Sequence, residues 1–226
     1  MTVPGPRACG VCGHPAPAPH RAPTAELAPD LDLRPGEPAR STLARWMLTC
    51  RNCGAAAADL AALTPDDRPV IDGREYQALR GTGRRFRRYA AICRANGQAR
   101  EAGNAMLQAA WMADDAGEES NARAWRLEAA ALWTDPPDEE TALRRIDALR
   151  RAGDLTAAAA EAADWAGRTH DDSGARILAF QNARIAAADV GVYRISSALR
   201  PPAHSPHVAH GKRPSQKGFL ARLLGR

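Results

Sequence analysis

The sequence is poor in aromatic residues and lysine, and it has no long apolar run. Aromatic side chains make up 5% of its 226 residues, whereas alanine is abundant. A β-sandwich needs many β-branched and aromatic residues, so this composition favours closely packed helices. No apolar run approaches the roughly 18 residues that span a bilayer, and the first residues form no apolar signal core. We therefore expect a mainly α-helical, cytoplasmic protein.

Basic charge is unevenly distributed along the chain. The formal net charge is +5, but residues 200–226 contain six Lys or Arg and no acid. The remaining residues carry 25 basic against 26 acidic side chains. The body is therefore nearly neutral and the tail is basic, which makes nucleic acid a less favoured partner than protein.

The composition divides the chain into three segments. Residues 1–63 are rich in Pro and Gly, with weak helix signals until residues 55–63, and hold four of the five cysteines. Residues 64–199 follow a helical period from about residue 74 onward. Residues 200–226 are expected to be a disordered basic tail with a short amphipathic end, suited to a membrane surface or a partner groove.

Two helix–turn–helix patterns repeat in the middle segment. Gly97 and Gly153 each separate two helix-like runs, and small residues recur at positions that face a partner helix. This pattern is typical of tetratricopeptide-like antiparallel hairpins, although Arg145 occupies an apolar position. Further helices are expected at residues 121–133 and 174–189. An irregular helical bundle is the alternative.

Two Cys-x2-Cys-Gly turns predict a metal site. The ligands are Cys9, Cys12, Cys50 and Cys53. Each turn directs two thiolates to one point, and four thiolates match tetrahedral zinc. Iron also binds four thiolates and is the less favoured ion. Disulfides are rare in the cytoplasm, and a redox pair would need a βαβ setting that the sequence lacks. With all four positions filled by protein, the zinc would be structural.

Two further residues near these patterns carry expectations. Cys93 occupies an apolar helix position and is predicted to be a small core residue. Trp46, just before the second cysteine turn, is predicted to cover the metal site within a short strand.

The chain resembles a bacterial family known as domain of unknown function 2225. The resemblance covers about residues 7–197 and rests on the two cysteine turns, the polar segment 30–40, Trp46 before the second turn, and the helical repeats that follow. Arg51 and Ala55 stand where the family commonly has Pro and Tyr. The resemblance implies a zinc-ribbon-like head joined to tetratricopeptide-like helices, in a cytoplasmic protein, and it implies no activity.

Two groups of charged residues are candidate binding sites. The first is a polar cluster between the cysteine turns, made of Asp30, Asp32, Arg34, Glu37 and Arg40. It is either a binding site beside the metal or a set of ion pairs and turns that order a long loop. The second consists of Arg84, Arg87 and Arg94 on one helix face, which would clamp an acidic peptide or remain a solvated surface.

No pattern of catalytic residues is present in the sequence. It has no P-loop, no GxGxxG and no HExxH motif. We therefore expect a non-catalytic, zinc-binding, repeat-type interaction module or scaffold with a protein or peptide partner. The alternative is a nucleic-acid-associated or regulatory zinc protein.

Overall fold

The computed structural model describes residues 7–134, 136–168 and 171–199, and it is mainly helical, as the composition predicts. Short helices come first and last: α1 (Arg68–Asp72), α2 (Arg74–Ala78) and α9 (Ile195–Leu199). The long helices are α3 (Arg84–Ala95), α4 (Ala99–Asp115), α5 (Glu119–Leu132), α6 (Glu139–Ala152), α7 (Leu155–Ala166) and α8 (Asp172–Ala186). The helices expected at 121–133 and 174–189 are thus α5 and α8.

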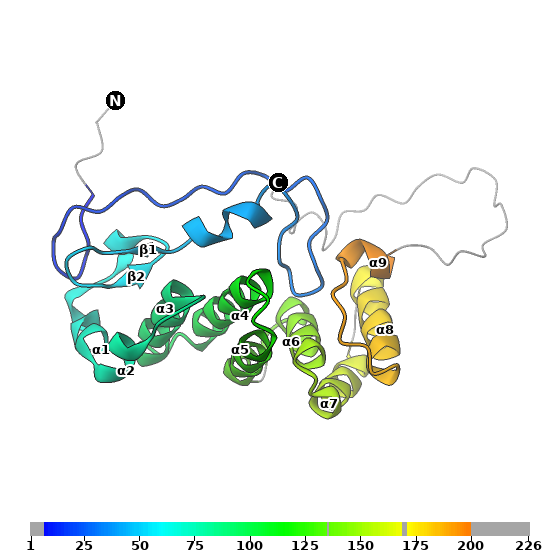
Figure 1. Ribbon diagram of the computed structural model, residues 1–226. Helices are drawn as coiled ribbons and strands as arrows, with labels where there is room; N and C mark the ends of the chain where they lie inside the picture. The colour runs from blue at the N-terminus through cyan, green and yellow to red at the C-terminus, as the bar shows by residue number, and fades with distance from the viewer. Residues whose placement is uncertain (1–6, 135, 169–170, 200–226) are drawn as a thin grey trace.

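The long helices pack in chain order. From α3 to α8, each helix contacts the next, and the helices stand in a row from α1 to α9 (Figure 1). Gly97 and Gly153 occupy the predicted turns with φ of 70° and 88°, a left-handed conformation that glycine adopts without a steric penalty. Alanines such as Ala102, Ala129 and Ala158 are fully buried, so neighbouring helix backbones approach closely.

A small two-stranded sheet surrounds the second cysteine turn. Strand β1 (Leu48–Thr49) pairs antiparallel with β2 (Ala56–Ala57). The helix signal at residues 55–63 is therefore not realised as an α-helix. This stretch contains β2 and a single 3-10 turn, Leu60–Ala62, because the cysteine turn folds the chain back onto β1.

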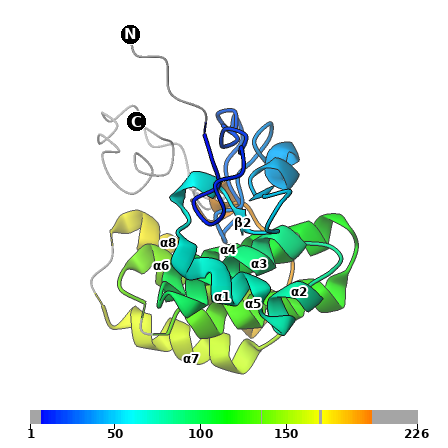
Figure 2. The ribbon, with the colours of Figure 1, turned by 90° about the vertical axis from the view of Figure 1, so that its left-hand side faces the viewer.

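The segment between the cysteine turns, residues 14–49, runs along the row of helices, and we call it the strap. It lies along one side of the helices in two perpendicular views (Figures 1 and 2). The N–H of Leu31 donates to the carbonyl of Tyr193, and the N–H of Ile195 donates to the carbonyl of Pro29, both at 2.9 Å. Leu31 packs with apolar residues of α6 and α8. The strap thus joins the cysteine turns to the far end of the row.

The apolar core continues across residue 63. Cys9, Cys50 and Leu60 pack in one cluster with Ile71 of α1 and Tyr76 of α2. The cysteine-bearing segment is therefore not packed as an independent body, and changes at the cysteines should reach the first helices.

The two expectations for Trp46 and Cys93 have different outcomes. Trp46 does not cover the cysteines from a strand. It ends a 3-10 turn, donates its Nε1–H to Thr42 Oγ1 at 2.8 Å, and packs on the core formed by α3, α4 and α5. Cys93 is fully buried in that core, as predicted, and burial raises the pKa of its thiol.

The amphipathic tail at residues 200–226 lies outside the described residues. Within the described part of the chain, no helix combines the length and apolarity needed to cross a membrane.

Candidate metal centre

The two cysteine turns share one backbone geometry. In the first, the N–H of Cys9 donates to the carbonyl of His14 at 2.8 Å and the N–H of Gly13 donates to the carbonyl of Cys9 at 2.8 Å. In the second, Cys50 pairs in the same way with Ala55 at 2.8 Å and with Gly54 at 3.0 Å. Gly13 and Gly54 have φ of 70° and 75°, which explains the glycine after each Cys-x2-Cys.

The four cysteine sulfurs lie close together. All four Sγ atoms lie within 4.8 Å of one another. The Sγ atoms of Cys9 and Cys53 are 3.8 Å apart, and those of Cys12 and Cys50 are 3.6 Å apart. A tetrahedral ion with metal–sulfur bonds of about 2.3 Å places its sulfurs about 3.8 Å apart. These two spacings match that value, the cluster is a possible metal site, and none of the cysteines is in a disulfide.

Hydrogen bonds from backbone N–H groups lower the pKa of the cysteine thiols, whereas burial raises it. The N–H of His14 and the side chain of Asn52 lower the pKa of Cys12 to about 6. Burial raises the pKa of Cys53 to about 12, although the N–H of Ala55 acts in the opposite direction. Four thiolates in contact repel one another, so the full set ionises only when a cation balances the charge.

The polar cluster lies away from the sulfurs. Asp32 reaches α4, α5 and α6, through Trp111, Arg126 and Arg151. Asp30 pairs with Arg40 within the strap, and Glu37 accepts hydrogen bonds from Ser41. The structure thus places these residues as ion pairs and turns that order the strap, rather than beside the metal site.

Asp32 is at the centre of a buried charge network. Its Oδ2 accepts from Trp111 Nε1 and from Arg151 Nη1, both at 2.8 Å, and the side chain is fully buried. Arg126 and Arg151 also donate to Asp114 of α4, at 2.5 and 2.9 Å. Arg34 donates to Asp115 at 2.5 Å. Three arginines and three aspartates thus balance in charge where the strap meets three helices.

Burial alone would raise the pKa of Asp32. Arg151 and Arg126, with the Trp111 hydrogen bond, instead hold it below its ordinary value. The sequence offered little signal for this network, because Arg126 and Arg151 occur among many other helical arginines.

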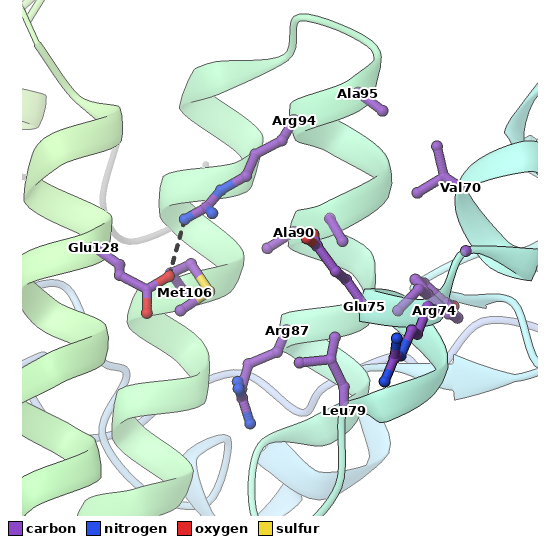
Figure 3. A pocket seen from close by; sticks show the side chains of 13 residues that line it. Val70, Arg74, Glu75, Leu79, Arg87, Ala90, Arg94, Ala95, Met106 and Glu128 are labelled. Carbon is purple, nitrogen blue, oxygen red and sulfur yellow. Dashed lines mark hydrogen bonds and ion pairs between the residues drawn. The ribbon is translucent and has the colours of Figure 1, made fainter.

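The three candidate clamp arginines do not form one group. Arg87 and Arg94 line a cavity of about 560 Å³ between α1–α2 and α3–α5, together with Arg74, Leu79 and Met106. Figure 3 shows Arg94 turned toward Glu128, with which it pairs at 3.0 Å. Arg87 lies over the ring of Trp125, 4.8 Å from its centroid. Arg84 does not line this cavity.

Comparisons with protein families, with curated proteins and with solved structures found no match to this chain. The resemblance to domain of unknown function 2225 therefore stays a prediction from the cysteine turns, the polar segment and the repeats.

Proposed function

We propose that this chain is a non-catalytic interaction module in which one zinc ion holds the two cysteine turns together and tetratricopeptide-like helices bind a partner peptide. The observation that carries the zinc proposal is the set of four Sγ atoms within 4.8 Å of one another, in which the Cys9–Cys53 and Cys12–Cys50 spacings match tetrahedral coordination. Zinc fits better than iron because a structural role needs no redox change.

A structural role for the metal follows from the number of its ligands. The four cysteines would fill every tetrahedral position, so no position is left for a water molecule or a substrate. The metal would stabilise the fold by closing the strap at both ends. A cytoplasmic location agrees with this role, because reducing conditions keep the thiols available for the metal.

The repeat proposal rests on the helix pairs. Helices α3 and α4 are joined at Gly97, and α6 and α7 at Gly153, with small buried alanines between the paired helices. Such pairs stack into arrays with one face open to a partner. The 560 Å³ cavity lies on this array, beside α3 and α5.

The chemistry of this cavity favours a partner segment with an apolar side chain next to a carboxylate. Leu79, Ala90 and Met106 supply apolar surface, and Arg74 and Arg87 supply donors near it (Figure 3). Arg74 is exposed and has no ion pair among the described residues. A carboxylate held by arginine gains charge-assisted hydrogen bonds.

Two experiments test the proposal. Elemental analysis of reduced, purified protein should find about one zinc per chain, and four thiolates binding iron instead would show visible absorption. Selection from a displayed peptide library should enrich peptides with an acidic group beside an apolar residue. Arg74→Glu should abolish binding of the selected peptides.

Arg84→Glu is the matched control, because Arg84 is also exposed and lies outside the cavity. Equal loss of binding in both variants would contradict the assignment of this cavity. Absence of bound metal would contradict the zinc proposal.

A further inference from the structure

A second cavity lies beneath the strap, separate from the metal centre and from the proposed peptide site. Its volume is about 510 Å³. Leu33, Pro35, Trp46 and Met47 of the strap form one wall. Tyr89 of α3 and several residues of α4, among them Trp111, form another, and Arg144 of α6 also lines it. Three aromatic rings from three different parts of the chain therefore face one space.

Arg144 is a buried cation with no hydrogen-bond acceptor among the residues that the structure describes. It is 9% exposed, and none of these residues accepts from its Nε. Among the described residues, the one carboxylate oxygen within 4.0 Å of its guanidinium is Glu140 Oε1, at 3.9 Å, which is too long for a hydrogen bond. Its guanidinium packs over the ring of Trp133, 4.9 Å from the centroid. Burial lowers the pKa of this arginine, so its charge is costly in this position.

Three other buried arginines near the strap differ from Arg144 in their hydrogen-bond partners. Arg34, Arg126 and Arg151 are as buried as Arg144, and each donates to an aspartate at 2.5 to 2.9 Å. The protein pairs a buried guanidinium with a carboxylate at each of these positions. Arg144 instead lines the cavity beneath the strap.

The remaining polar groups of the cavity limit the charge of an occupant. Asn104 has a buried Oδ1 to which no described residue donates, and Glu101 adds a negative charge to the lining. One buried guanidinium matches a single negative charge, whereas a phosphate dianion would meet Glu101 with excess negative charge. The indole and phenol rings suit a flat apolar body.

We propose that the cavity beneath the strap binds a small organic monocarboxylate with a flat apolar or aromatic body. The carboxylate accepts hydrogen bonds from the Arg144 guanidinium, and the apolar body lies among Trp46, Tyr89 and Trp111. This site is independent of the proposed peptide site, because the two cavities share no lining residue.

The probe for this site is 2-naphthoate, compared with its neutral analogue 2-naphthamide on the metal-loaded protein. Calorimetry should show binding of the acid about tenfold tighter than binding of the amide, the effect expected of a charge-assisted hydrogen bond. In ¹⁵N-edited spectra, the indole N–H signals of Trp46 and Trp111 should shift, and that of Trp165 should not.

Two variants test the role of the guanidinium. Arg144→Gln should remove the preference for the acid, while leaving a folded protein by thermal melting. Arg100→Gln removes the same charge from an exposed position and should keep the preference. Equal affinity for acid and amide in the unmodified protein, or no binding of either, would overturn the proposal even if Arg144→Gln fails to fold. An unchanged preference in folded Arg144→Gln would also overturn it.

Discussion

Replacing Asp32 with Asn should destabilise the protein strongly, although Asp32 lies in an irregular segment. The substitution keeps the size of the side chain and removes its charge. It leaves Arg126 and Arg151 in a buried cluster with one aspartate fewer. It also weakens the acceptor for Trp111 Nε1 and for the backbone N–H of Arg34.

The magnitude follows from burial. Removing one partner of a buried ion pair typically costs about 3–5 kcal/mol. Because Asp114 still accepts from both Arg126 and Arg151, we expect the lower end of this range. A loss of about 3 kcal/mol is a large part of the roughly 5–15 kcal/mol that stabilises a folded domain. It corresponds to a fall in the urea midpoint of about 1 M for a typical m-value.

Urea unfolding of metal-loaded protein, followed by circular dichroism, measures this loss. Asp164→Asn is the control, since it removes the same charge from an ion pair with Arg168 in which the two side chains are 63% and 47% exposed. An exposed ion pair contributes about 0–1 kcal/mol, so the control should change little. Equal effects of the two substitutions, or an Asp32→Asn cost below about 1 kcal/mol, would refute the argument from burial.

The same variant has a predictable pH dependence. The pKa of Asp32 lies below its ordinary value in the folded protein, because Arg151 and Arg126 outweigh burial. As pH falls, the unfolded chain therefore takes up this proton before the folded chain does. The contribution of Asp32 is present above its ordinary pKa and is lost as pH falls toward its folded pKa. The stability difference between the original protein and Asp32→Asn should therefore shrink on acidification.

Three further outcomes are expected. Cys53→Ser should lose the metal and lower the melting temperature of the helical domain, because the cysteines share a core with α1 and α2. An unchanged unfolding transition in calorimetry would contradict this. Gly10→Ala should weaken metal retention in a chelator competition, since a Cβ there would lie 1.7 Å from the Leu63 carbonyl oxygen. The control Gly13→Ala meets no atom within 4 Å and should cost only about 1–2 kcal/mol of backbone strain. Chelation of the metal should weaken 2-naphthoate binding, because the strap that forms one cavity wall is tied at both ends by the cysteine turns; unchanged binding would show that the helices alone hold the strap.

Local patterns in the sequence predicted the cysteine cluster and the helices. Each cysteine turn is built by hydrogen bonds within six residues, so its form follows from Cys-x2-Cys-Gly alone. The helices and the turns at Gly97 and Gly153 follow in the same way from contacts three and four residues apart and from glycine's freedom at positive φ.

Only the tertiary structure decided the path of the strap and what lies beneath it. Asp32 meets Trp111 and Arg151 across 79 and 119 residues of sequence. No local sequence period encodes such a pairing, and the sequence contains many other arginines that could have paired with Asp32. The prediction that Trp46 covers the metal site was wrong for the same reason. The neighbours of Trp46 in space come from α3 and α4 rather than from the cysteine turn that follows it. Arg144, which has no hydrogen-bond acceptor among the described residues, became visible as a feature only beside three buried arginines that each donate to an aspartate, because burial and pairing are properties of the packed chain.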